Sequence, residues 1–236
     1  MPKAAAIIIG NEILSGKFAD ENGPWLAQEC RRLGIDLIRI VVIPDLVDVI
    51  AQEVRRSAAE VDFVFTTGGI GPTHDDTTME GIAVAFGEPL VRHPGLEGLI
   101  RDGMGDSVNE DALGMADVPN GTILWEDPGL RFPVVVCRNV VIFPGVPSFF
   151  QAKFRAVSHR FAGEVVQSVQ FRTLERETSI ANTLREAQAL WPAVDIGSYP
   201  RFETQPPSVV VTMDSRDSGL LEECSRWLQE RVSVTD

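Results

Sequence analysis

The chain has 236 residues and is 44% hydrophobic, which is enough apolar material for one large domain or for a large domain and a small one. Its formal net charge of -13 at pH 7 argues against the broad basic surface that nonspecific nucleic-acid binding needs. No apolar run approaches the length of a membrane span, and Cys30, Cys137 and Cys224 lack the spacing of a disulfide framework or a metal motif. We therefore expect a cytoplasmic protein with reduced thiols, and neither nucleic acid nor a membrane as a partner.

Up to residue 86 the chain alternates short apolar runs with segments of helical spacing. One such segment carries Trp25, Leu26, Cys30 and Leu33 on a single face and ends at Gly34. This alternation predicts a mostly parallel sheet covered by helices on both faces. The expected strands are residues 4–9, 36–43 and 61–67, and the expected helices are residues 20–33, 47–59 and 78–86.

Between residues 88 and 130 the pattern is less regular. The two apolar runs that follow meet at Arg138-Asn139, which predicts a hairpin. A rigid turn, Pro144-Gly145-Val146-Pro147, then precedes another helix. The elements expected in this part are helices at 94–104, 109–115 and 148–161 and strands at 132–137 and 139–143.

The pattern changes near Ala162-Gly163, after which the expected elements follow in the order β-α-β-β-α. This order is typical of a small α+β domain. We therefore predict two domains, residues 1–162 and residues 163–236. The expected strands of the second are residues 165–174, 195–199 and 208–213, and its expected helices are residues 179–191 and 219–232.

The loop at residues 68–78, between a predicted strand and a predicted helix, has the composition of a phosphate site. Its glycines remove side chains that would keep the backbone away from a ligand, and the helix start adds unpaired N–H groups. N-capping accounts for one aspartate or threonine, but the loop end carries two of each. We predict that this loop binds a ligand through Thr67, Gly68, Gly69, Gly71, Pro72, Thr73, Asp75 and Thr78, with Asp75 and Asp76 able to hold a metal ion.

Further polar residues follow other predicted strands, and in a parallel sheet they would gather at the same edge. Asp45 comes after the second strand, where it could face the ligand or simply cap the next helix. The Pro144–Ser148 segment could approach the ligand or act as a rigid connector with Ser148 as a helix cap. The candidate binding residues outside the loop are Gly10, Asn11, Glu12, Pro144, Gly145 and Ser148.

Thr67-Gly68-Gly69-Ile70-Gly71-Pro72-Thr73-His74-Asp75-Asp76-Thr77-Thr78 resembles the signature of the molybdopterin-binding (MoaB/MogA-like) domain family. More specifically, the chain resembles the N-terminal region of the competence/damage-inducible CinA proteins and the pterin-binding-like domain of FAD synthase. Further similar segments are Gly10 to Gly16, Asp20-Glu21-Asn22, Leu33-Gly34-Ile35 and Pro144-Gly145-Val146-Pro147, and Gly197-Ser198-Tyr199-Pro200 is similar to the KH-like α+β domain of CinA.

This resemblance implies a three-layer α/β/α domain followed by a small α+β (KH-like) domain. It also implies that Asp45 and Asp76 are the catalytic positions. CinA-like proteins are associated with divalent-metal-dependent hydrolysis of ADP-ribose-type nucleotides, and FAD synthase with FAD hydrolysis, so Mg, Mn or Co is the expected cofactor. A homo-oligomer, dimer or trimer, is also implied, whereas the deamidase activity of full-length CinA proteins is not expected.

Three functions therefore remain open for a small phosphorylated ligand at the 68–78 loop. The first is metal-dependent hydrolysis of the pyrophosphate in ADP-ribose or FAD. The second is the binding or adenylylation of molybdopterin, which would then be the cofactor. The third is a ligand-binding module without catalysis, because Asn109-Glu110-Asp111-Ala112 and Asp127-Pro128-Gly129 depart from the CinA pattern.

Overall fold

The computed structural model describes residues 1–235 and separates them into two compact units. The first is Met1–Gly163 and the second begins at Glu164. Each unit contains its own sheet and its own hydrophobic core. No helix in the described part of the chain is long and apolar enough to cross a membrane.

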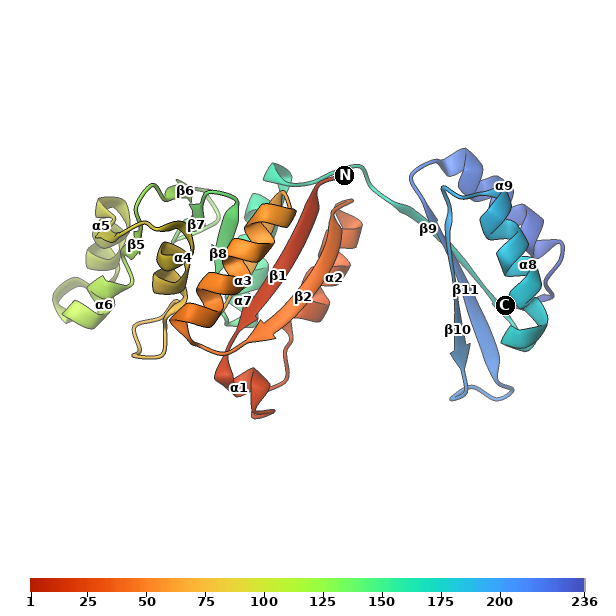
Figure 1. The fold of residues 1–236 in the computed structure, drawn as a ribbon, viewed down its shortest axis with the longest axis horizontal. Coiled ribbons are helices and arrows are strands. Elements are labelled where there is room, and N and C mark those ends of the chain that lie inside the picture. The colour runs from red at the N-terminus through yellow and green to blue at the C-terminus, as the bar shows by residue number, and fades with distance from the viewer. Residues whose placement is uncertain (236) are drawn as a thin grey trace. The chain divides into compact units, whose positions relative to one another are not determined.

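The first unit is built on a six-stranded sheet with the strand order β2-β1-β3-β8-β7-β6 (Figure 1). Four neighbouring strands, β2, β1, β3 and β8, run parallel, whereas β7 and β6 are antiparallel to their neighbours. This arrangement confirms the mostly parallel sheet. The strands are β1 (Lys3–Ile9), β2 (Asp36–Ile43), β3 (Phe63–Thr67), β6 (Ile123–Trp125), β7 (Val134–Cys137) and β8 (Val140–Phe143).

Helices cover both faces of this sheet, as the alternation of strand and helix predicted. The period of two along β1 sends Ala5, Ile7 and Ile9 into one core and Ala4 and Ala6 into the other. The first core is closed by α3 (Val47–Glu60), α4 (Thr78–Phe86), α5 (Pro94–Met104) and α6 (Glu110–Gly114), and the second by α2 (Asn22–Arg32) and α7 (Pro147–Val157). The three-layer α/β/α architecture is thereby confirmed.

Several element boundaries differ from the sequence-based expectation. Helix α2 begins at Asn22 rather than at residue 20, because the Asp20 carboxylate accepts the N–H groups of Asn22 and Gly23 at 2.9 and 3.1 Å. Helix α7 begins at Pro147, so Ser148 lies inside its first turn and does not have the alternative role of a helix cap. The helix expected up to residue 161 ends in the 3₁₀ helix Ser158–Arg160. The elements not expected at all are α1 (Asn11–Leu14), β4 (Leu90–Arg92), β5 (Asp117–Pro119), β6, β12 and the 3₁₀ helix Gly105–Ser107.

The expected hairpin is confirmed by the antiparallel pairing of β7 with β8. Cys137 pairs with Val140, so the turn is the two residues Arg138 and Asn139. Arg138 has a φ of 53°, the left-handed conformation that tight hairpin turns require. The Asn139 amide donates to the carbonyls of Ala58 and Val61, both at 3.0 Å, which ties the turn to the end of α3.

Lys153 on α7 is partly buried, with its ammonium group against two carbonyl oxygens. Its Nζ donates to Phe132 O at 2.9 Å and to Pro133 O at 2.6 Å. Burial disfavours the charged form and lowers the pKa of Lys153 from 10.5 to about 8. Because its pKa is lower in the folded protein, the unfolded chain binds more protons between these values, and stability rises with pH there.

We therefore expect Lys153→Met to change how stability depends on pH. Relative to the variant, the wild-type free energy of unfolding should rise by about 2 kcal/mol between pH 7 and pH 10. Urea unfolding of both proteins at the two pH values measures this difference, in which the titration of all other groups cancels. If the free energy of unfolding depends on pH in the same way for the two proteins, the pKa of Lys153 is not lowered by folding.

The second unit is a four-stranded antiparallel sheet, in the order β10-β11-β9-β12, with two helices packed against it. Alternate residues of the strands, such as Phe171, Val211 and Met213, face Ile180 and Leu228 of the helices. The small α+β domain is thereby confirmed. Its elements are β9 (Gln167–Thr173), α8 (Glu177–Leu190), β10 (Asp195–Arg201), β11 (Ser208–Ser215), α9 (Ser218–Gln229) and β12 (Val234–Thr235).

Strand β10 lies at an edge of this sheet, and a side chain occupies part of that edge. The Gln188 amide donates to Val194 O at 2.8 Å and accepts the N–H of Ile196 at 3.3 Å. These are the two bonds that a peptide group of a neighbouring strand would make. Further along β10, Pro200 has no N–H to offer, as is common in edge strands.

The three cysteines are free, and each lies in a different hydrophobic core. Cys137 belongs to the core under α3 and α4, Cys30 to the core under α2 and α7, and Cys224 to the core of the second unit. Burial raises the pKa of all three thiols, that of Cys30 to about 12. The thiolate, which is the reactive form, is therefore suppressed at each position.

Candidate functional site

The 68–78 loop leaves β3 in a backbone conformation that favours glycine. Gly68 and Gly69 have φ values of 102° and 62°. A Cβ on Gly68 would lie 2.0 Å from the carbonyl oxygen of Ile9, which ends β1. The loop therefore turns directly against the end of the neighbouring strand, and its backbone is free of side chains at that point.

Thr78, the first residue of α4, holds this turn in place. Its Oγ1 donates to Gly68 O at 2.8 Å, and its N–H donates to Gly69 O at 3.0 Å. The side chain is completely buried. Thr78, a predicted binding residue, thus fixes the shape of the loop from beneath.

The acidic end of the loop is organised around Thr73. The Thr73 N–H donates to Asp76 Oδ2 at 2.8 Å. The Thr73 hydroxyl lies 2.6 Å from Asp75 Oδ1 and 2.5 Å from Asp76 Oδ2, although it has one proton to donate. The hydrogen bond from Thr73 lowers the pKa of Asp75 below its ordinary value, with a smaller contribution from His74. Two carboxylates therefore lie side by side with one hydroxyl between them.

Asp45 lies at the carboxyl end of β2, beside this loop. Its Oδ2 accepts the N–H of Asn11 at 2.7 Å, and its Oδ1 would lie 3.5 Å from a Cβ on Gly69. Helix α3 has no side-chain cap, so Asp45 does not have the alternative role of capping it. Burial raises the pKa of Asp45, and the negative charges of Glu12 and Asp75 raise it further against the effect of the Asn11 bond.

The predicted residues after β1 and β3 are thus brought together with Asp45. The N–H of Gly10 donates to Ile43 O at 3.1 Å and joins the end of β1 to the end of β2. Glu12 is exposed in α1, near enough to Asp45 to affect its pKa. Gly71 lies against the Asp76 carboxylate, and Pro72 is exposed at the tip of the loop.

The segment after β8 approaches the loop from the other side. A Cβ on Gly145 would lie 3.2 Å from Gly68 Cα, and Thr67 Oγ1 donates to Pro144 O at 2.9 Å. Pro144 and Gly145 therefore adjoin the loop, and their contact with a ligand stays a prediction. Ser148 is exposed in the first turn of α7. Among residues 1–235, it takes part in none of the contacts between this segment and the 68–78 loop described above.

Asn22 connects the two segments and was not singled out from the sequence. Its Nδ2 donates to Thr67 Oγ1 at 2.9 Å and to Gly145 O at 2.7 Å, and the residue is only 5% exposed. The one available signal was its place in Asp20-Glu21-Asn22, a segment that reads as an ordinary helix start. Its partners are 45 and 123 residues away in the chain, so local patterns do not reveal them.

Replacing Asn22 by Ala is expected to loosen the loop and lower the stability of the first unit by about 2 kcal/mol, because two buried hydrogen bonds are lost. Urea unfolding measures the change. Asn182→Ala, at an exposed position of α8, serves as the matched control and should change stability by less than about 0.5 kcal/mol. Equal losses of stability for the two variants would show that Asn22 does not hold the loop in place.

The charge of the site is negative, although its backbone suits a phosphate. The charged groups that shift the pKa of Asp45 and Asp75 are Glu12, Asp75 and His74, and none of them is a lysine or an arginine. No cluster of three or more His, Cys, Asp or Glu suited to an ion is found within residues 1–235. Mg²⁺ commonly takes one or two carboxylates together with phosphate oxygens of a ligand, and Asp75 and Asp76 are the residues that could supply such carboxylates.

Comparisons with known proteins cover both units. A family profile described as a probable molybdopterin-binding domain matches residues 5–162, and one described as the middle domain of FAD synthase matches residues 166–235. A protein of Archaeoglobus fulgidus is 36% identical over 96% of each chain. The crystal structure of the protein CinA of unknown function from Thermoplasma acidophilum is 30% identical, with a TM-score of 0.63 over 68% of this chain and 98% of its own.

Another similar protein is about twice as long as this chain. A probable FAD synthase of Caenorhabditis elegans is 32% identical over 98% of this chain, which spans 50% of that protein.

Proposed function

The chain belongs to the family of probable molybdopterin-binding domains, in agreement with its glycine loop, and on this basis we propose that the 68–78 loop binds the phosphate groups of a nucleotide. The N–H groups of Gly69, Ile70 and Gly71 would hold one phosphate, because those of Thr73, Asp76 and Thr78 already bond within the loop. The Pro144-Gly145 segment would lie beside the same phosphate, because it packs against Gly68. Gly68, Gly69 and Gly71 allow the backbone to approach the phosphate oxygens closely.

A divalent cation is part of this proposal. The carboxylates of Asp45, Glu12 and Asp75 interact electrostatically, and an anionic ligand beside them needs a compensating positive charge. Asp75 and Asp76 would hold the ion together with ligand phosphates. When bound, such an ion lowers the pKa of water and stabilises negative charge on a leaving phosphate.

The reaction we propose is hydrolysis of the pyrophosphate in ADP-ribose or FAD. The oxygen of water forms a bond to one phosphorus, and the bond from that phosphorus to the bridging oxygen breaks. Asp45 accepts the proton of the attacking water, and the second phosphate leaves with the bridging oxygen. The observation that supports this role most directly is the position of Asp45 beside Gly69 with a raised pKa, since a base is most effective when its pKa approaches the working pH.

The test is to incubate the protein with ADP-ribose or FAD and with Mg²⁺, Mn²⁺ or Co²⁺, and to measure AMP. Asp76→Ala is the control that removes a metal ligand and a support of the loop. AMP formation by the wild type well above that of the variant is expected. If the wild type forms no more AMP than Asp76→Ala with any of the ions, the hydrolase proposal is wrong, and calorimetry then shows whether the chain only binds these nucleotides.

Molybdopterin binding or adenylylation is a second candidate, supported by the description of the matched family. Exposed apolar side chains follow the carboxyl ends of β1, β2 and β8, where a flat pterin ring could lie. These are Leu14, Phe18, Leu46, Val146 and Phe149. A fluorescent pterin copurifying with the protein would favour this candidate, and no binding of molybdopterin at micromolar concentration would speak against it.

We also propose that the protein forms a homo-oligomer, either a dimer or a trimer. Light scattering measures the mass directly, and a mass equal to the 25.8 kDa of one chain would contradict the proposal.

A further inference from the structure

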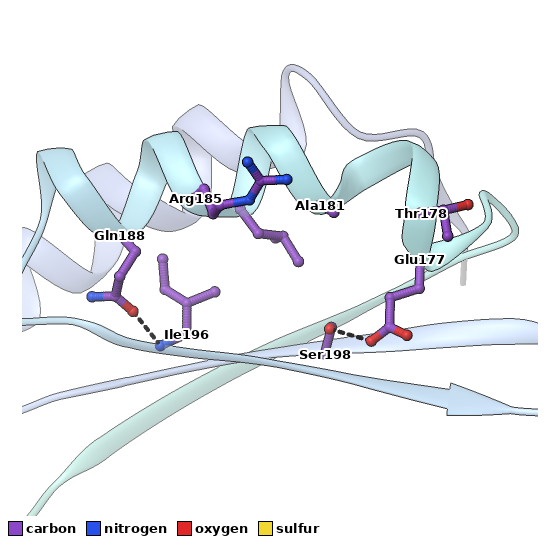
Figure 2. Close-up of a pocket in the computed structure, with 8 residues that line it drawn as sticks. Glu177, Thr178, Ala181, Arg185, Gln188, Ile196 and Ser198 are labelled. Carbon is purple, nitrogen blue, oxygen red and sulfur yellow. Dashed lines mark hydrogen bonds between the residues drawn. The ribbon is translucent and has the colours of Figure 1, made fainter.

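The second unit contains a cavity of about 500 Å³ between helix α8 and the edge strand β10. Figure 2 shows Glu177 and Ser198 facing each other at one end, and Ile196 and Gln188 at the other. Ala181 lies between them on the helix, and its small side chain leaves the space open. The volume is within the usual range for pockets that bind small molecules.

A second cavity of about 510 Å³ adjoins the first, because both are lined by Glu177 and Thr178. Its other lining is largely apolar and includes Leu174, Pro200, Phe202 and Pro207. Phe202 is 80% exposed, an unusual position for a phenylalanine. The two cavities form one groove along α8, with an aromatic platform at one end.

Glu175 and Arg176 line the Phe202 end of the groove, and two further charged groups, Glu177 and Arg185, follow along α8. Glu177, in the first turn of α8, accepts the Ser198 hydroxyl through Oε1 at 2.5 Å, which leaves its second oxygen available. Arg185 lies about two turns further along α8 and has no acidic partner within residues 1–235. Because side chains of a helix lean toward its N-terminus, the Arg185 guanidinium can extend back toward Glu177.

We propose that this groove binds a mononucleotide. The base stacks on Phe202 between the prolines, the ribose hydroxyls donate to Glu177, and the phosphate is held by Arg185. Each group of the protein matches one part of the ligand: an aromatic ring binds the face of a base, a carboxylate accepts from ribose hydroxyls, and a guanidinium binds a phosphate. The order of the three groups along the groove is the order of base, sugar and phosphate.

An extended peptide fits the same groove less well. A peptide that adds to a sheet edge needs a row of free N–H and C=O groups. On β10 the N–H of Ile196 is already bonded to Gln188, and Pro200 has none. Only Ser198 between them remains, which suits a compact ligand.

The experiment is a titration of the full chain with AMP, followed by the amide resonances of the protein. Saturable shifts are expected for residues 174–209, with a dissociation constant separate from that of any shifts in the 68–78 loop. Arg185→Ala and Phe202→Ala should each weaken binding in the groove by roughly tenfold or more and leave the loop shifts unchanged. Arg226→Ala, which removes an exposed arginine of α9 outside the groove, is the charge-matched control and should have no effect.

Two results would overturn the proposal. The first is that AMP shifts no resonance in residues 174–209, whatever it does at the 68–78 loop, so that failure here is distinct from failure of the hydrolase proposal. The second is that 2′,3′-dideoxy-AMP binds in the groove as tightly as AMP, since loss of both hydroxyls should cost roughly tenfold if they donate to Glu177.

Discussion

Gly68→Ala is expected to destabilise the first unit by about 4 kcal/mol or more and to abolish ligand binding at the 68–78 loop. The added Cβ would lie 2.0 Å from the carbonyl oxygen of Ile9, and this oxygen belongs to the backbone of a buried central strand. Relief would require β1 and β3 to separate, and the φ of 102° adds strain of its own. Hydrogen exchange of peptides from residues 1–163 in increasing urea measures the loss within this unit.

Gly87→Ala is the matched control for this experiment. Gly87 also has a positive φ, 69°, but a Cβ there would meet nothing within 4 Å. Its substitution should therefore cost about 1 kcal/mol, from backbone strain alone. Similar losses of stability for the two variants would show that the close approach of Gly68 to Ile9 adds nothing to the cost of Gly68→Ala.

Asp45→Asn is expected to lower the turnover of ADP-ribose or FAD by about 100-fold to 1000-fold, if the proposed hydrolysis is correct. The amide keeps the size of the side chain but cannot accept the proton of the attacking water. The wild-type rate should rise with pH as Asp45 ionises, and because its pKa is raised above 3.8, this rise lies at higher pH than for an ordinary aspartate. Rate measurements across pH on both proteins test the assignment, and the variant should lack this rise.

Asp48→Asn provides the comparison for this second experiment. Asp48 is exposed in the first turn of α3, three residues after Asp45. Its substitution removes the same charge from the same region, so it should change turnover by less than about twofold if Asp45 acts as the base rather than through its charge alone. A pH profile of Asp45→Asn that keeps the wild-type rise would assign that rise to another group.

The elements that could be predicted from the sequence are those with a strong local pattern. The buried strands before Gly10 and Gly68 and the hairpin at Arg138-Asn139 belong to this class, because periodicity and turn residues act over a few neighbours. The short strands β4, β5 and β6 have three residues each, too few for a period to appear. They form because distant segments supply their partners.

The candidate site divides in the same way. The glycines and acids of the 68–78 loop could be found because they are contiguous in the chain. That Asp45 lies beside Gly69 could be expected from strand order, but its bond to Asn11 in place of a cap on α3 required the folded chain. Asn22 was missed because its role depends on Thr67 and Gly145, which reach it only through the packing of α2 against the sheet.

Because the three buried cysteines lie in different cores, their reactivity reports which part of the protein opens by local unfolding. Each thiol is shielded in a different core, so an alkylating reagent can modify it only when that core is exposed. The rates at which Cys30, Cys137 and Cys224 acquire the label, read by mass spectrometry, would therefore measure the opening of the two faces of the large sheet and of the second unit separately. The wild-type chain therefore carries one natural probe in each of the three cores. Whether the cores open together or separately can be measured without engineered labels.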